Sequence, residues 1–524
     1  MQAAHPAPPS KATAAGAERH PIVIVGTGFA GLCMGIRLKQ AGIDDFVLLE
    51  REAELGGVWR DNVYPGVACD IESNLYSFSF EPNPAWSRMY GPQPEILAYL
   101  NRCADRYGLR PHIRFRTAAV AASFDERSGL WTVQTSGGGE LRARVLISGS
   151  GHALTRPVYP DIPGISAFTG KSFHSSRWDH DFPLAGKAVA VIGTGASAIQ
   201  IIPAIAPAVA QMHVFQRTAP WVVPKADRPM TPREQARFER APWLQRLHRA
   251  ALYWRHELFA LGFVVDPRIN ELAGRLALRY LEACVPDAAL RERLTPDYTL
   301  GCKRVLLSND YYQALGRPNV ELVTEGIAEI RPRSIVTRDG QERPVDAIVY
   351  ATGFEAAEAA APFELRGRGG RDLNAAWGRG IEAHLGCAIA GFPNLFLLLG
   401  PNTGLGHSSM VFMIESQVAY ILDAIKAMRA EGLAMVDVLP GAQVRYNGWL
   451  QSRLARAVWS TGCQSWYLTR SGKNTTAWPG FTFEFRLRTR RFDRENYERR
   501  PHDPADAAAE QGGAIAAGGG LELG

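Results

Sequence analysis

The chain has 524 residues, of which 46% are hydrophobic and 21% are charged, and its formal net charge is +6. One hydrophobic core rarely serves a chain of this length, so we expect two or three domains, and so mild a charge does not argue for nucleic-acid binding. Seven scattered cysteines, without metal or disulfide spacing, predict reduced thiols in a reducing, cytoplasmic compartment and no metal site. No stretch is apolar enough to predict a membrane span.

Both ends of the chain have the composition of disordered tails. Residues 1–19 are rich in Ala and Pro, and residues 501–524 are rich in Ala, Gly and acidic residues. Such segments carry too few large apolar residues to build a packed core. The folded domains are therefore expected between these two tails.

A glycine-rich turn follows the first buried strand, which the apolar residues 21–25 predict. Gly26 allows the tight turn, Gly28 lets the backbone approach a pyrophosphate, and Gly31 lets the next helix pack on the strand. Strand, glycines and helix in this order predict the start of a dinucleotide-binding unit.

The same unit continues with a helix over residues 32–40 and a second strand over residues 46–49, which ends at Glu50. A carboxylate at that position accepts hydrogen bonds from the hydroxyls of a ribose. A glycine turn without a ligand is the less favoured interpretation, because all the elements occur in the expected order.

A pair of adjacent glycines opens the stretch of residues 56–70. Gly56 and Gly57 let the backbone lie close to a large flat group. Taken alone, Trp59 is more often a core residue and Asp70 more often an exposed loop residue. If Asp70 is buried, it needs a partner.

A second dinucleotide unit begins near the middle of the chain. Residues 187–192 predict a strand, and Gly193 and Gly195 repeat the first two glycines, with Ala198 in place of the third. A helix and then a strand over residues 211–215 follow, as in the first unit.

The two units differ in charge at their ends. Glu50 lies 24 residues after Gly26, and Arg217 lies 24 residues after Gly193. A carboxylate favours a free ribose 2′-hydroxyl, whereas an arginine suits a 2′-phosphate, to which the Thr218 hydroxyl can add a donor. We therefore predict FAD or NAD in the first unit and NADPH in the second. A solvated surface arginine is the alternative for Arg217.

The predicted fold class is α/β, with two Rossmann-like domains for FAD and NADPH and a helical insertion in the NADPH domain. We expect an apolar strand within residues 346–354 to return the chain to the first sheet. The predicted order is FAD domain (20–155), NADPH domain (156–224), helical insertion (225–300), NADPH domain (301–345) and FAD domain (346–500).

Three motifs resemble those of the flavin-containing (type I) Baeyer–Villiger monooxygenases, and the resemblance spans most of the chain between the tails. One motif is Cys302-Lys303-Arg304, which resembles the segment that carries the family's catalytic arginine, although Val305 stands where many members have proline. The second motif matches at Phe168, Gly170, His174, Trp178 and Asp179. The third motif matches at Gly56, Gly57, Trp59, Tyr64, Pro65, Gly66 and Asp70.

The resemblance implies an enzyme that uses FAD, NADPH and molecular oxygen to convert a ketone to an ester or lactone through a C4a-peroxyflavin. It places the Arg304 cation beside the negative charge that develops, with Asp70 holding Arg304. It places Lys303 near the NADPH 2′-phosphate. It gives His174 and its neighbours a role in coupling the domains and no role as a base.

Further residues are expected at the two cofactor sites. Trp466 belongs to a loop over residues 465–480 that could close over NADPH, although it could equally be a core residue. The other expected cofactor-binding residues are Phe29, Gly57, Val58, Trp59 and Tyr76 on the FAD side and Thr194 and Ser197 on the NADPH side.

The remaining segments are interpreted from their patterns. The helical periodicity of residues 225–300, with Leu247 and Trp254 on one face, predicts an insertion that either walls the substrate pocket or is structural cover. A glycine-rich turn precedes a helix at residue 410, and its Gly404 and His407 could approach the flavin. Alternation over residues 481–487 predicts a half-buried strand with a basic outer face. That face is more often solvated than bound to lipid or another subunit.

Three other functions compete with this interpretation. A sister flavin monooxygenase that oxygenates N or S shares both glycine turns, but Trp178-Asp179 favours the ketone reaction, with sulfoxidation as a side activity. A flavin disulfide reductase needs two close cysteines near the flavin, and Cys69 is alone in its region. The third alternative is a non-catalytic NADPH sensor, in which Arg304 and Asp70 would have no catalytic role. The particular ketone and the oligomeric state stay open.

Overall fold

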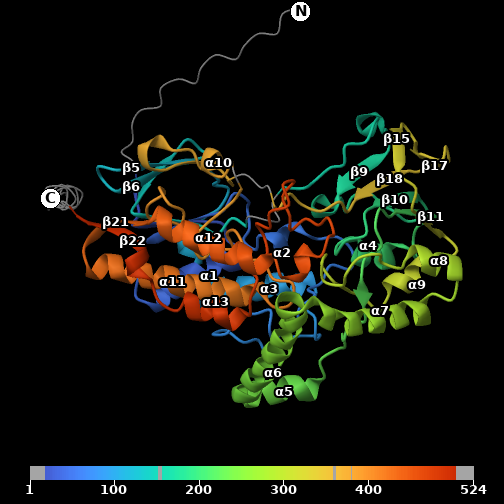
Figure 1. The fold of residues 1–524 in the computed structure, drawn as a ribbon, viewed down its shortest axis with the longest axis horizontal. Coiled ribbons are helices and arrows are strands. Elements are labelled where there is room, and N and C mark those ends of the chain that lie inside the picture. The colour runs from blue at the N-terminus through green and yellow to red at the C-terminus, as the bar shows by residue number, and fades with distance from the viewer. Residues whose placement is uncertain (1–17, 152–155, 358–360, 379, 503–524) are drawn as a thin grey trace, which may run out of the picture.

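Two five-stranded parallel sheets, each at the centre of its own lobe, organise the computed structural model (Figure 1). The structure describes residues 18–151, 156–357, 361–378 and 380–502. The predicted tails lie outside this part of the chain except at their inner ends. There, Glu18–Arg19 form strand β1 and Pro501 ends strand β22, so the prediction of disorder is wrong for these residues.

The first sheet has the strand order β20-β8-β2-β3-β4, and all its neighbouring strands are parallel. Ile22 and Ile24 of β2 pack toward helices on one face, and Val23 and Val25 pack toward a mixed sheet on the other. Burial on both faces explains why these strands are continuously apolar. They span Leu395–Leu397 (β20), Val145–Ser148 (β8), Ile22–Val25 (β2), Phe46–Leu49 (β3) and Ile113–Arg114 (β4).

The second sheet has the order β14-β11-β10-β18-β9 and is also parallel throughout. Strand β18 pairs with β10 and β9, so the expected return of residues 346–354 to the first sheet is wrong. A continuously apolar strand suits either parallel sheet, and its long-range pairing decides between them. Strand β20 makes the return. The strands span Val320–Val323 (β14), Gln211–Phe215 (β11), Ala188–Ile192 (β10), Ala347–Tyr350 (β18) and Lys171–His174 (β9).

The predicted strands at residues 46–49 and 211–215 are confirmed residue for residue, and so is the α/β fold class with two dinucleotide-type sheets. A mixed sheet of order β1-β7-β6-β5-β19 lies on the first sheet, and three small sheets complete the fold. The remaining strands span Ala119–Asp125 (β5), Leu130–Thr135 (β6), Glu140–Ala143 (β7), Glu364–Arg366 (β19), Val222–Val223 (β12), Leu306–Leu307 (β13), Ile327–Arg331 (β15), Ser334–Thr337 (β16), Glu342–Pro344 (β17), Leu433–Val438 (β21) and Tyr497–Pro501 (β22).

Helices cover the sheets in each lobe. Helix α1 follows the first glycine turn and packs in one apolar cluster with α3 and α11, while α4 follows the second turn and packs with α9. These helices span Phe29–Gln40 (α1), Val58–Asp61 (α2), Gln93–Arg106 (α3), Ala198–Ile205 (α4), Tyr311–Leu315 (α9), Leu373–Ala376 (α10), Met410–Ala430 (α11) and Pro440–Leu454 (α12).

The helical insertion links the two lobes, and α5 and α6 project from the lower margin of the molecule in Figure 1. Helix α6 is anchored on the first lobe, because Gln245 Nε2 donates to Asn74 Oδ1 at 2.7 Å and His256 Nε2 lies 2.7 Å from Glu72 Oε2. No described helix has both the length and the apolar character needed to cross a membrane. The insertion contains α5 (Pro232–Arg240), α6 (Pro242–Ala260), a π-helical turn (Leu261–Val265), α7 (Asn270–Cys284) and α8 (Ala288–Arg293).

The segment predicted as a basic strand is a helix, α13 (Thr482–Arg488). Thr482, Phe485 and Thr489 are fully buried. Their spacing of three and four positions is that of one helix face, and it overrides the alternation of phenylalanines on which the strand prediction depended.

Substitution of Phe485 by alanine tests this geometry. In a helix, Phe485 and Leu487 point to different sides, and Leu487 is 64% exposed. We expect Phe485→Ala to lower the free energy of unfolding by about 3–4 kcal/mol and Leu487→Ala by at most about 0.5 kcal/mol, measured by urea unfolding. Similar losses for both variants would support the strand.

Candidate active site

The first glycine turn leaves no room for side chains. Gly26 has φ +95°, and a Cβ there would lie 2.8 Å from the Gly149 carbonyl oxygen. A Cβ on Gly31 would lie 1.9 Å from the Gly26 carbonyl oxygen, so helix α1 packs directly on the turn. A Cβ on Gly57 would lie 3.1 Å from the Cα of Gly28. The two glycine motifs of the first lobe therefore meet backbone to backbone, which fits the approach of a pyrophosphate.

Glu50 lies at the end of β3 beside this turn, and its carboxylate is held in a fixed orientation. The backbone N–H of Thr27 donates to Glu50 Oε2 at 3.2 Å, and Arg60 Nη1 lies 2.9 Å from Glu50 Oε1. The buried carboxylate thus has its charge partner within the protein. Its position fits the predicted contact with a ribose.

Three aromatic residues predicted at the flavin site form one cluster behind the turn. Trp59 Nε1 donates to the Tyr76 hydroxyl at 3.1 Å, and the Phe29 ring meets the Tyr76 ring edge-on with centroids 5.1 Å apart. Phe29 and Trp59 are also members of the apolar core. Val58 begins α2 directly after Gly57 and is half-buried.

The second glycine turn offers a more open backbone surface. Gly193 has φ +111°, and a Cβ there would lie 2.5 Å from the Ala351 carbonyl oxygen, whereas a Cβ on Gly195 would meet no atom within 4 Å. Ser197 is the residue before α4. The Thr194 hydroxyl donates to the carbonyl oxygen of Thr218 at 3.3 Å. An open glycine backbone at the start of a helix fits a dinucleotide pyrophosphate.

Two cations lie together at the end of this unit. Pairing of β12 with β13 brings the residues after Arg217 next to the residues after Arg304. Burial and the nearby Arg217 cation lower the pKa of Lys303, whose Nζ lies 4.7 Å from the centre of the Tyr298 ring. No carboxylate in the described part of the chain forms an ion pair with either cation. This arrangement fits a 2′-phosphate, as predicted for Arg217 and Lys303.

Arg304 and Asp70 form an ion pair between Nη2 and Oδ2 that joins the two lobes. The Asp70 carboxylate raises the pKa of Arg304 above its already high ordinary value, so the guanidinium stays charged. Burial raises the pKa of Tyr467 to about 12, and the nearby Arg304 cation opposes this rise. The sequence interpretation missed Tyr467 as a neighbour of Arg304, because no motif links the two positions.

The segment that supplies Asp70 also contacts the second lobe. Gln200 of α4 accepts from the Tyr64 hydroxyl and from the Ala68 N–H, both at 3.3 Å, and donates to the Ala68 carbonyl oxygen at 3.1 Å. A Cβ on Gly66 would lie 2.6 Å from the Gln200 carbonyl oxygen. Residues 56–70 therefore touch the first glycine turn, the helix that follows the second turn, and Arg304. Gln200 carries no sequence signal of its own.

The motif at residues 168–179 contains strand β9, the edge strand of the second sheet. His174 is fully buried, its Nε2 donates to the Gly353 carbonyl oxygen at 3.1 Å, and its Nδ1 accepts from the Ser176 N–H at 3.2 Å. Burial lowers the pKa of His174, so the ring is a neutral structural group. Gly353 follows β18, where the chain leaves the second sheet. This contact supports a coupling role, which stays a prediction.

The other members of that motif hold the strand in place. A Cβ on Gly170 would lie 2.5 Å from the Asp346 carbonyl oxygen. Phe168 packs on the apolar cluster of the second sheet, and Trp178 meets Phe173 edge-on with centroids 5.0 Å apart. Asp179 forms an ion pair with Lys171.

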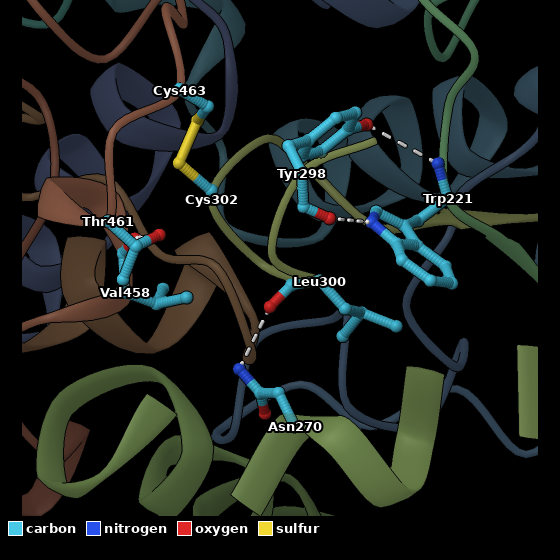
Figure 2. Close-up of a disulfide and its surroundings, with 8 residues drawn as sticks. All are labelled: Trp221, Asn270, Tyr298, Leu300, Cys302, Val458, Thr461 and Cys463. Carbon is cyan, nitrogen blue, oxygen red and sulfur yellow. Dashed lines mark hydrogen bonds between the residues drawn. A yellow bond between two sulfur atoms is a disulfide. The ribbon is translucent and has the colours of Figure 1, made fainter. Parts of the chain in front are cut away.

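A disulfide joins Cys302 to Cys463, with Cα atoms 6.2 Å apart across 161 residues of sequence (Figure 2). The prediction of seven reduced thiols is therefore wrong for this pair, because sequence spacing cannot reveal a contact between segments so far apart. Figure 2 shows the disulfide between the loop that carries Tyr298 and the segment that carries Val458. The bond ties the residue two positions before Arg304 to the segment that carries Trp466.

The remaining candidates lie near this loop. Trp466 is 40% exposed and stacks on Tyr467 with ring centroids 4.4 Å apart, so the core interpretation of Trp466 is wrong and its cofactor role stays a prediction. His407 is buried, with Nε2 3.7 Å from Glu257 Oε1. Gly404 donates its N–H to the Thr476 carbonyl oxygen at 2.8 Å. The approach of Gly404 and His407 to a flavin stays a prediction.

Fold and site together define an oxidoreductase that holds two dinucleotides, with the Arg304–Asp70 ion pair joining its two lobes. A family model described as a pyridine nucleotide-disulphide oxidoreductase matches residues 23–248. The two cysteines of the disulfide lie outside those residues, so the match gives no support to the disulfide reductase alternative.

A curated Baeyer-Villiger monooxygenase of Pseudomonas aeruginosa is 50% identical over 487 residues, which cover 93% of this chain and 92% of that protein. The structure of oxidized steroid monooxygenase bound to NADP has a TM-score of 0.81 and 32% identity, covering 92% of this chain and 100% of that one. The structure of OTEMO in complex with FAD and NADP has a TM-score of 0.82 and 28% identity, with the same coverage of 92% and 100%.

The chain belongs to the Baeyer–Villiger monooxygenase family. This confirms the family that the three motifs predicted, and with it the prediction of an FAD- and NADPH-dependent enzyme.

The disulfide can be tested by counting thiols. Titration of the unfolded, unreduced protein should find five free thiols, which is the seven cysteines minus the bonded pair, and reduction should restore seven. On the chain-entropy model, opening a loop of 161 residues lowers the free energy of unfolding by about 5 kcal/mol. Seven free thiols under oxidising conditions would refute the pairing.

The 2′-phosphate site can be tested through coenzyme preference. Arg217→Ala and Lys303→Ala should each raise the Kd of NADPH by about tenfold or more, because each removes a charge-assisted contact to the phosphate. The Kd of NADH, which lacks that phosphate, should change little in the same titrations. An equal loss of affinity for both coenzymes would contradict the assignment.

Proposed function

We propose that this protein uses FAD and NADPH, bound at the first and second glycine turns, to insert an oxygen atom from O2 beside the carbonyl of a ketone, giving an ester or lactone. The observation that supports this proposal is the Arg304–Asp70 ion pair, which joins the lobe whose glycine turn suits a flavin to the lobe whose glycine turn suits NADPH. The cation pair at Arg217 and Lys303 supports NADPH rather than NADH as the reductant.

When bound, FAD would supply the redox chemistry: it would accept a hydride from NADPH and activate molecular oxygen. The residues of the chain orient the reactants and stabilise charge. Glu50 and the backbone of Gly26 and Gly28 hold the first dinucleotide. Arg217, Thr218 and Lys303 hold the second through its 2′-phosphate.

Arg304 is the proposed catalytic residue. Negative charge develops on oxygen during insertion beside a carbonyl, and a fixed cation aimed at that charge stabilises it without further reorganisation. Because Asp70 raises the pKa of Arg304, the guanidinium cannot act as an acid at working pH and donates hydrogen bonds only. Asp70 is a positioning residue, since its carboxylate holds one end of the guanidinium.

Replacement of Arg304 tests the proposal. Arg304→Ala should still bind flavin and accept electrons from NADPH without oxygen, while ester formation from a panel of ketones falls by about 10²–10³-fold or more. Product is measured by gas chromatography and flavin reduction by its absorbance. Arg331→Ala, which removes an exposed arginine of β15 that pairs with Glu329 and Glu342, is the matched control.

Ester formation at the parent rate by Arg304→Ala would refute the role of Arg304. Absence of ester from every ketone with the parent enzyme, together with steady oxidation of amines or sulfides, would instead favour the N- or S-oxygenating alternative.

A further inference from the structure

Helix α6 exposes large apolar residues and buries several polar ones. Trp243, Leu247, Trp254 and Leu258 are 64%, 61%, 57% and 66% exposed. They follow one another at 4, 7 and 4 positions, so they form one stripe along the helix. Gln245 and His256, on the opposite side, are buried against the first lobe. A helix on a water-facing surface ordinarily has the reverse arrangement.

More exposed apolar residues follow α6 in the chain. Val265 is 56% exposed, and Ile269, Leu272 and Leu276, which share one face of α7 and the turn before it, are 50%, 66% and 55% exposed. The structure therefore leaves an apolar surface uncovered along two consecutive helices.

Helix α13 adds to the same surface. The Phe483 ring lies 6.1 Å from the Trp254 ring, and Phe483 and Leu487 are 38% and 64% exposed. We call these exposed residues of α6, the 261–269 segment, α7 and α13 the apolar face. They are 10 of the 18 large hydrophobic side chains that are exposed in the described part of the chain, so the exposure is concentrated here.

The exposed charges around the apolar face are mostly positive. Within residues 242–284 and 481–491, the exposed charged side chains are nine arginines and two glutamates, Glu271 and Glu282. The other acidic residues there are half-buried or buried; Glu257, for example, accepts the N–H of Thr482 at 3.0 Å. The apolar face is thus bordered almost entirely by cations.

We propose that the apolar face docks the protein on an anionic lipid surface. Trp, Phe and Leu beside arginine is the composition of segments that lie in the headgroup region of a bilayer, where the rings enter the interface and the guanidinium groups meet lipid phosphates. In Figure 1, α5 and α6 project from the body, so a flat bilayer can reach α6.

The charges also decide against a second copy of the chain as the occupant. A symmetric dimer through this face would bring the arginines of one copy toward the arginines of the other, and like charges oppose such a contact. An anionic lipid surface offers the opposite charge. The apolar face contains none of the residues assigned to the cofactor sites or to catalysis, and the proposal does not depend on the reaction that the enzyme catalyses.

The test is flotation of the flavin-loaded full-length enzyme with lipid vesicles. We expect binding to vesicles that contain phosphatidylglycerol, much weaker binding to pure phosphatidylcholine, and weakening by salt. Leu247→Ser with Leu258→Ser should lower the fraction bound to phosphatidylglycerol vesicles at least tenfold. Val444→Ser is the matched control, because Val444 is also 66% exposed but lies on α12.

Flavin content and NADPH oxidation should be unchanged in the double variant, which separates lost docking from lost folding. If the double variant does not fold, Arg275→Glu with Arg279→Glu, both exposed, replaces it and should abolish the preference for anionic vesicles. Absence of vesicle binding, or equal loss in Val444→Ser, would overturn the proposal. The proposal would also fail if the parent enzyme binds no vesicles, forms a dimer in light scattering, and becomes a monomer in the double variant.

Discussion

The Arg304–Asp70 ion pair is the contact on which the arrangement of the site depends. Asp70 ends a segment whose Gly57 lies against the first glycine turn, while Arg304 follows Lys303 at the cation pair of the second unit. One charge-assisted contact therefore relates both cofactor turns to the same guanidinium. Loss of Asp70 would remove the carboxylate that holds one end of the Arg304 guanidinium, so the orientation of Arg304 depends on this contact.

Two further contacts limit the movement of Arg304. The Leu306 N–H donates to the Trp221 carbonyl oxygen at 2.9 Å, where β12 pairs with β13 just after the arginine. On the other side, Cys302 is bonded to Cys463. A pairing contact, a covalent bond and an ion pair thus fall within five consecutive residues. Such support matters because a charge stabilises a reaction only where its position is fixed in advance.

Local patterns predicted much of this molecule. The order of strand, glycines and helix located both dinucleotide units. Counting positions from each glycine turn was enough to find the charge difference between Glu50 and Arg217. Predictions that required long-range pairing failed. The strand at residues 347–350 fits either sheet by composition, and Cys302 and Cys463 have no relation in sequence. The periodicity of α6 predicted a helix, but it could not show that the stripe with Leu247 and Trp254 stays uncovered.

Polar contacts, rather than loose packing, hold that stripe outward. Although burial raises the pKa of Glu72, its contacts with His256 and Arg255 hold that pKa at about 2, so a charged carboxylate is paired beneath α6. Rotation of α6 to bury Leu247 would break this pair and leave the Glu72 charge unsatisfied, at a cost that burial of the leucine side chain would not offset. Buried polar groups of this kind specify one orientation of a helix. The exposure of the α6 stripe is therefore built into the contacts of α6 with the first lobe.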